Sequence, residues 1–340
     1  MTARPALANR WRSKQLVVHR NTLGLIRRGT YPRVESFMKR SVHGIAVLLF
    51  VLAGCAGAGG VAKDSRYAPS ESLLDIVTNF HRFSREDLYR FPVPKDLAGI
   101  NVHRATLIRL DDYEENHPGR YPDIIMYTRA MAYERLREYG KAMDAYRRVA
   151  AMESSPLSPE ARASLDALGD FEKILEDYGA SNGDPAAFVA HLEEKARAWR
   201  ALGEMYRGTV YEYLALIEAE RMDRLTTEYL QVNRHRLAGG DDLVIEAYQA
   251  LITTHESSKH RNEYVVELAD FYVVLAREYV RAHPPQDRTF QWQEFAEWAN
   301  KAWRLYADVA QRDGSLEKLE AQGKLQALQA YLSKVRAASQ

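Results

Sequence analysis

Few side chains in this chain of 340 residues have the types and spacing that chemistry requires, because it contains only ten histidines and one cysteine. A single cysteine excludes a disulfide framework, a four-cysteine zinc site and a CxxC redox centre. The nearest histidine pair, His255 and His260, is five positions apart, whereas two metal ligands on one helical face need a spacing of three or four. No HExxH or Walker A motif occurs, and no serine nucleophile elbow stands out. We therefore expect no catalytic residue, no metal and no small-molecule cofactor.

A group of acidic residues offers the remaining catalytic possibility. Paired carboxylates perform glycoside hydrolysis when they flank one bond. The same residues within one helix are more typical of a solvated helix face, and we favour that interpretation for Asp111, Asp112, Glu114 and Glu115.

The formal net charge of +1 is the sum of a basic head and an acidic body. Residues 1–37 hold eight Lys or Arg against one acid, a net of +7, and Lys39 and Arg40 add two positive charges. The remaining 37 bases and 45 acids give the rest of the chain a net charge of −8. Because a negative body repels phosphate, we expect no nucleic-acid partner for it.

The boundary between head and body has the pattern of a secretory signal that begins at Met38. Lys39 and Arg40 precede an apolar run of nine residues from Ile45 to Ala53, which small residues follow. Such a run is too short for the roughly 20 residues of a membrane-spanning helix, but it fits the hydrophobic region of a signal peptide. We therefore expect residues 38–54 to be a cleaved signal peptide.

The apolar run ends in Leu52-Ala53-Gly54-Cys55, which resembles the lipobox of bacterial lipoproteins. In that family the signal is cut before the cysteine, which is then acylated. The resemblance implies a covalent lipid on Cys55 and membrane binding through this anchor, because several acyl chains hold firmly at about 0.8 kcal/mol per buried CH₂. Ala56, by the same resemblance, implies the periplasmic face of the outer membrane.

Residues 1–37 allow three interpretations. Their arginine-rich, acid-poor composition resembles a mitochondrial transit peptide and would also suit a basic nucleic-acid tail. Neither combines with a signal at residue 38, so we favour a translation start at Met38, with residues 1–37 as upstream sequence or a disordered basic segment. Residues 55–70, in which Ala56-Gly57-Ala58-Gly59-Gly60 follow Cys55, are expected to form a flexible tether.

Beyond the tether, apolar residues recur at helical spacing and strand signals are nearly absent. The pattern predicts an all-α chain with two helical-repeat regions, residues 71–180 and 184–340. Proline and glycine mark the stops. The predicted helices cover Ser72–Phe83, Ala98–Asn116, Pro122–Arg137, Lys141–Met152, Pro159–Asp177, Pro185–Met205, Thr209–Arg236, Asp241–Thr254, Asn262–Ala282, Gln291–Gln311 and Leu316–Ala337.

Part of this pattern resembles a tetratricopeptide repeat. In such repeats small residues let two antiparallel helices approach, and aromatic residues fill the space between helix pairs. Arg129 and Arg137 depart from the pattern, which prefers leucine and glycine there. The matching small and aromatic positions are Ala130, Tyr133, Tyr139, Ala142 and Tyr146.

A second copy strengthens the repeat interpretation. The sequence from Lys141 to Ala150 recurs from Lys301 to Ala310 with five identical residues over ten positions. Two divergent copies predict an α-solenoid of antiparallel helix pairs. The corresponding small and aromatic positions are Ala269, Tyr272, Ala302 and Tyr306.

The loops around His117-Pro118-Gly119 and His255-Glu256-Ser257-Ser258 each follow an apolar helix end. In this respect the chain resembles the helical-repeat lipoprotein of the outer-membrane β-barrel assembly machinery and its relatives. That resemblance implies an interaction scaffold.

Three tryptophans belong to the segment that distinguishes the second copy. Aromatic side chains of this kind either pack between helices or grip a partner. We expect the repeat tyrosines to pack internally and part of the tryptophan segment to face a partner. The candidate partner surface is Trp292, Trp298 and Trp303.

These patterns together predict a membrane-anchored scaffold of the bacterial cell envelope that binds other envelope proteins on its helical repeats and performs no reaction. One alternative is an envelope enzyme or glycan-binding protein with a site in the cleft between the two helical regions. Another is an accessory or pilotin lipoprotein of a secretion, pilus or motility assembly.

Overall fold

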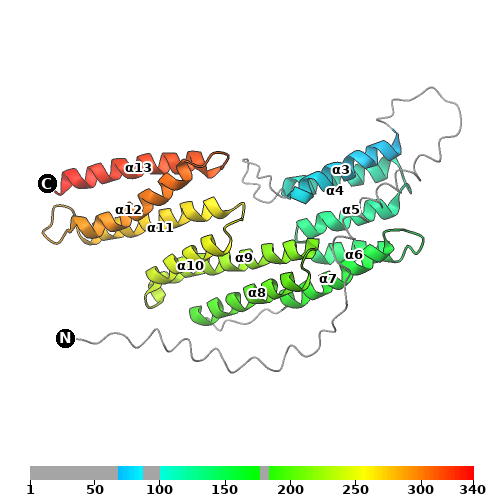
Figure 1. Ribbon diagram of the computed structural model, residues 1–340, viewed down its shortest axis with the longest axis horizontal. Coiled ribbons are helices and arrows are strands. Elements are labelled where there is room, and N and C mark those ends of the chain that lie inside the picture. Colours follow the sequence, from blue (N-terminus) through cyan, green and yellow to red (C-terminus); the bar gives the residue numbers. More distant parts are fainter. Residues whose placement is uncertain (1–67, 87–99, 177–183) are drawn as a thin grey trace. The chain divides into compact units, whose positions relative to one another are not determined.

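A computed structural model describes residues 68–86, 100–176 and 184–340 (Figure 1). In these ranges the chain forms eleven α-helices and one 3₁₀ turn, and no described residue lies in a strand. The prediction of an all-α chain is therefore confirmed for this part. Residues 1–67 lie outside the described ranges, and with them the predicted signal peptide, Cys55 and almost all of the predicted tether.

The helices begin and end close to the residues at which the sequence predicts them. They are α3 Pro69–Glu86, α4 Ile100–Asn116, α5 Pro122–Arg135, α6 Tyr139–Ala150, α7 Ser158–Glu176, α8 Pro185–Met205, α9 Val210–Asn233, α10 Gly240–Thr254, α11 Arg261–Ala282, α12 Trp292–Ala310 and α13 Glu317–Ala338, with the 3₁₀ turn η3 Arg234–Arg236 after α9.

Local chemistry explains where the central helices start. The Asp184 side chain caps α8 by accepting a hydrogen bond from the backbone N–H of Ala186 at 3.0 Å, and Pro185 fills a first-turn position that needs no N–H donor. Thr209 caps α9 in the same way, accepting from the N–H of Tyr211 at 3.1 Å. These two caps fix the first residues of α8 and α9, the longest described helix pair.

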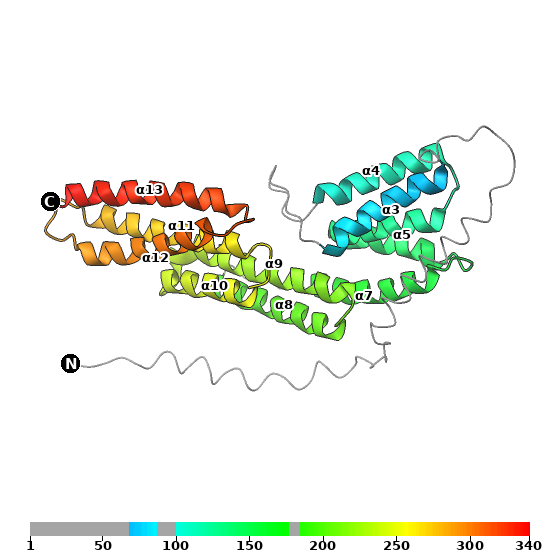
Figure 2. The same ribbon diagram turned by 45° about the horizontal axis from the view of Figure 1, so that its top comes forward.

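Packing in the described part joins helices that are neighbours in the sequence. The most extensive contacts are between α8 and α9, α11 and α12, and α5 and α6, and α11 also touches α13. Figures 1 and 2 both show α11, α12 and α13 side by side, with α10 next to α9. The arrangement is therefore a succession of paired helices.

The largest hydrophobic cluster is centred on Phe171 of α7. Its ring meets Trp199 of α8 with 4.9 Å between centroids, Tyr139 of α6 at 5.6 Å and Tyr211 of α9 at 6.0 Å, all edge to face. Edge-to-face contact is the favoured geometry of buried aromatic pairs. Four consecutive helices thus share one aromatic centre.

A second large cluster covers the helices from the end of α9 to α13. The change from the first cluster to the second falls within α9, between Leu225 and Leu230. The hydrophobic cores therefore divide at a different place from the predicted boundary near residue 180, and the two regions 71–180 and 184–340 stay a prediction. Smaller clusters join α3 to α5 and the far ends of α11, α12 and α13.

The small residues at the proposed repeat positions are buried without exception. Ala130 and Ala142 lie where α5 packs on α6, and Ala269 and Ala302 lie where α11 packs on α12; each has 0% of its surface exposed. Tyr139, Tyr146, Tyr272 and Tyr306 are also buried, whereas Tyr133 is only partly buried.

Substituting tryptophan at these alanines should overfill the helix pairs. We expect Ala142→Trp and Ala302→Trp each to lower the free energy of unfolding by ~1–3 kcal/mol, measured by urea denaturation followed by circular dichroism. Ala187→Trp, at an exposed position of α8, is the control. Unchanged denaturation of both core variants would show that the proposed repeat register is wrong.

Candidate functional site

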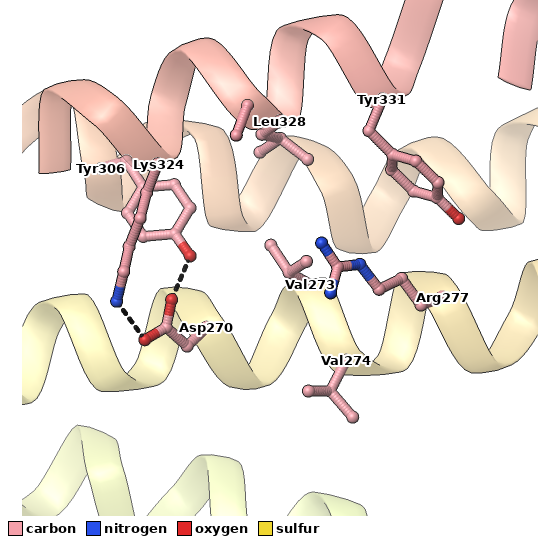
Figure 3. Close-up of a pocket in the computed structure, with 9 residues that line it drawn as sticks. Asp270, Val273, Val274, Arg277, Tyr306, Lys324, Leu328 and Tyr331 are labelled. Carbon is pink, nitrogen blue, oxygen red and sulfur yellow. Dashed lines mark hydrogen bonds and ion pairs between the residues drawn. The ribbon is translucent and has the colours of Figure 1, made fainter. Parts of the chain in front are cut away.

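A cavity of about 290 Å³ lies between α11, α12 and α13 (Figure 3). Its apolar wall comes from Val273 and Val274 of α11 and from Leu328 of α13. Polar side chains stand at both ends of this wall, and Figure 3 shows Asp270 and Arg277 on α11 on either side of the valines. Because α11 places residues 270, 273, 274 and 277 on one face, the helix itself sets the order acid, apolar, base.

The acidic end of the cavity is fully hydrogen bonded. Asp270 accepts a short hydrogen bond from the hydroxyl of Tyr306 on α12, and its second oxygen lies 2.5 Å from Nζ of Lys324 on α13. Lys324 also contacts Glu320 at 2.8 Å. Three helices are therefore tied together by one carboxylate.

The hydrogen bonds of this cluster keep its phenol and its ammonium protonated. Burial, the hydrogen bond to Asp270 and its negative charge raise the pKa of Tyr306 well above its usual value. Burial lowers the pKa of Lys324, but hydrogen bonds to Asp270 and Glu320 outweigh it, so that its pKa is raised. A general base at neutral pH needs the opposite shift, so the phenol and the ammonium stay protonated.

The basic end of the cavity is different, because Arg277 has no salt bridge or hydrogen bond to any residue in the described ranges. Its guanidinium instead lies over the ring of Tyr331, 5.7 Å from the centroid. Figure 3 shows the group between Val273 and Tyr331, at the cavity wall.

A second, more open depression of about 390 Å³ lies between α10, α11 and α12. Its apolar lining is Ile252, Leu268 and Leu305, with Tyr272 at one side and the two bases Lys301 and Arg304. No acidic residue lines this depression. We call it the α10–α12 groove.

Trp298, one of the three predicted partner-facing tryptophans, lies beside this groove. Its ring stacks on Tyr272 with 5.9 Å between centroids, and Nζ of Lys301 lies 4.4 Å from its ring centre. The other two are placed differently: Trp303 is 40% exposed on α12, whereas Trp292 is partly buried against Phe295 and lies under Arg336. The three as a partner surface stay a prediction.

Two buried carboxylates that contact tyrosines of the first hydrophobic cluster have no counterpart among the sequence predictions. Glu134 of α5 is almost completely buried and accepts a hydrogen bond from the hydroxyl of Tyr211 at 2.7 Å. Burial raises its pKa to about 7, and hydrogen bonds from Tyr211 and Tyr146 limit the rise. From the sequence alone, a glutamate within a helix is expected to face solvent. Only the nearby tyrosines, which can donate hydrogen bonds to a buried carboxylate, indicate a buried position.

Glu218 of α9 is the second buried carboxylate, with 0% of its side chain exposed. Arg137 binds both of its oxygens, through Nε and through Nη2 at 2.8 Å, and the hydroxyl of Tyr139 donates a further bond at 3.0 Å. Arg137 has a left-handed backbone (φ 62°), a conformation that favours glycine. The arginine that departs from the repeat pattern therefore forms a buried ion pair with a residue 81 positions away.

The other candidate residues have ordinary partners. His255 lies 2.8 Å from Asp223 and His260 lies 3.1 Å from Glu263, and no group of three possible metal ligands occurs among the residues that the structure describes. In the acidic group, Asp111 and Glu114 both bind Arg129. This arginine is the other departure from the repeat pattern.

The sequence also contains the GxSxG pattern of a serine nucleophile elbow. Residues Gly179 to Gly183 spell GxSxG, but they join two helices, α7 and α8, whereas a nucleophile elbow follows a strand. Residues 177–183 themselves lie outside the described ranges. The motif therefore adds no catalytic candidate.

No protein-family model, no curated protein and no solved structure matches the chain. Among the described helices, none combines the length and the apolar character that crossing a membrane requires.

Proposed function

We propose that this protein is a lipid-anchored scaffold of the bacterial envelope, an α-solenoid that binds another envelope protein on its helical repeats. The anchor is an acylated Cys55 at the end of the lipobox-like sequence, on the periplasmic face of the outer membrane. The succession of paired helices in the described part supports this architecture, because stacked helix pairs expose long grooves to partners.

The observation that carries the repeat proposal is a contact that occurs twice. Nζ of Lys141 lies 5.5 Å from the ring centre of Tyr133, and Nζ of Lys301 lies 5.7 Å from that of Tyr272. The two lysines occupy the same position of the repeated sequence, and each lies over the tyrosine of the preceding helix. Two copies of one packing arrangement support a common repeat unit.

The α10–α12 groove is the part of the second copy best suited to a partner. It combines apolar residues with tyrosine, arginine and a neighbouring tryptophan, the residue types that dominate binding energy in interfaces. Lys301 forms an ion pair with Glu297, outside the lining, at 2.7 Å, whereas Arg304 has no ionic partner in the described ranges. A partner segment with apolar and acidic residues would complement it.

The neighbouring cavity offers neither a phenolate nor a neutral amine as a general base. Tyr306 and Lys324 both have raised pKa values and share one carboxylate. Such a cluster stabilises the junction of α11, α12 and α13, because its hydrogen bonds and ion pair connect all three helices.

Site-specific cross-linking in membranes tests the proposal. A photoreactive amino acid at Thr253, an exposed residue of the groove, should trap the partner, and the same group at Leu319, which is 78% exposed elsewhere, is the control. Parallel palmitate labelling should mark the wild-type chain and not Cys55→Ala. The Cys55→Ala variant should also leave the membrane fraction, because its acyl chains are lost.

Two results would overturn the two halves of this proposal separately. An unlabelled wild-type chain would contradict the lipid anchor. Identical cross-linked products from positions 253 and 319, or none from position 253, would contradict a partner in the groove.

A further inference from the structure

We propose that the cavity between α11, α12 and α13 binds a short partner segment in which an apolar side chain stands beside a carboxylate, and that Arg277 binds this carboxylate. The inference rests on the proposed function, because it specifies the chemistry of the partner. It concerns a second site, distinct from the α10–α12 groove.

The size of the cavity favours one anchoring side chain. At about 290 Å³ it lies at the lower limit of pockets that enclose whole small molecules, which are about 300–1,000 Å³. Val273, Val274 and Leu328 form its apolar wall. An aromatic or branched side chain inserted there would remove apolar surface from water on both sides.

The charges of the cavity specify the second part of the ligand. Asp270 already binds Lys324 and Tyr306, and Lys324 also binds Glu320, so this end needs no further charge. Arg277 is the one base of the cavity lining without an ionic partner in the described ranges. A planar guanidinium matches a carboxylate with two parallel hydrogen bonds.

The placement of Arg277 couples the two contacts. It follows Val273 and Val274 by one helical turn on the same face of α11, and Tyr331 lies on its other side. The contact with the ring of Tyr331 is a cation–π contact, which uses none of the N–H donors of the guanidinium. A ligand carboxylate at that edge would place the adjacent side chain over the valines.

The smallest probe with this chemistry is N-acetyl-L-phenylalanine, and its amide is the uncharged counterpart. Fragments of about 15 non-hydrogen atoms bind in the millimolar range at ordinary ligand efficiency. We would titrate both into the full chain and measure dissociation constants by ligand-observed NMR. The acid should bind at least about tenfold more tightly than the amide, as expected for a hydrogen bond to a charged group.

Three variants separate the causes of binding. Arg277→Gln should weaken the acid about tenfold and leave the amide unchanged. Arg281→Gln removes the same charge one turn further along α11, outside the cavity lining, and should have no effect. Ala327→Phe, at an exposed position of the lining, fills the cavity without changing charge and should weaken both probes. Thermal denaturation of each variant checks that it is folded.

Equal binding of acid and amide, equal effects of the two arginine variants, or no binding of the acid to the wild-type chain would each overturn the proposal. The titration requires neither anchor nor partner. Its failure would therefore be distinguishable from a failure of membrane labelling or of cross-linking at position 253.

Discussion

Arg137→Ala should lower the free energy of unfolding by about 3 kcal/mol, because it leaves the carboxylate of Glu218 buried without its main partner. The side chain of Glu218 is fully buried on α9, and Arg137 reaches it from the turn between α5 and α6. The cost falls at the lower end of the range for broken buried pairs because Tyr139 and Arg221, the latter at 3.4 Å, still contact the carboxylate. Urea denaturation measures the loss.

Two further variants distinguish this mechanism from a simple backbone effect. Arg137→Gly removes the same guanidinium but relieves the left-handed backbone, so it should be about 1 kcal/mol less destabilising than Arg137→Ala. Adding Glu218→Leu to Arg137→Ala should recover most of the stability, because no unpaired charge remains. Arg221→Ala, which loses only the longer contact, is the matched control. If the double variant were no more stable than Arg137→Ala, the buried charge would not be the cause.

The second large effect depends on pH. Glu134 has its pKa raised from 4.5 to about 7 by burial, so the native state binds more protons than the unfolded state between these values. Its contribution to stability is therefore greatest below pH 4.5 and is lost as the pH rises towards 7, after which it is constant. Glu134→Gln removes this loss. The free energy of unfolding of the variant, relative to that of wild type, should rise by about 2–3 kcal/mol between pH 5 and pH 8.

For each protein we compare the free energy of unfolding at pH 8 with that at pH 5. A packing cost of the amide that does not depend on pH therefore cancels. Glu267, whose pKa is also raised to about 7 by burial, contributes equally to both proteins and cancels as well. Glu172→Gln, at an exposed position of α7, is the control and should shift neither curve. Parallel curves for Glu134→Gln and wild type would show that Glu134 titrates normally in the folded chain.

Helical periodicity and stop signals were sufficient to predict the described elements. Pro118 and Gly119 follow the end of α4, and Pro284 and Pro285 follow the end of α11. Proline cannot donate a helical hydrogen bond, and glycine loses more backbone entropy in a helix than other residues do. The repeat alanines could be predicted as buried because close helix packing requires a small side chain. These are local rules, and the chain follows them.

The polar contacts could not be predicted in the same way. Arg137 was recognisable as a departure from the repeat pattern, but its partner Glu218 is 81 positions away, and nothing in either local sequence pairs them. The tryptophans show the same limit, because Trp303 is 40% exposed whereas Trp292 is partly buried against Phe295, and neither environment can be read from the local sequence. Side-chain environment depends on helices that are distant in sequence.

The nearest-neighbour packing of the helices also has a kinetic consequence. Since contacts join consecutive helices, closing them requires only short loops and little chain entropy. Chains with such local contact order fold rapidly, in microseconds to milliseconds for small helical domains. Among the described helices, α13 packs mainly against α11 and α12, so it should open before the central helices and exchange its amide hydrogens faster than they do. Local opening of α13 would uncover the α11–α13 cavity while the Phe171 centre stays closed.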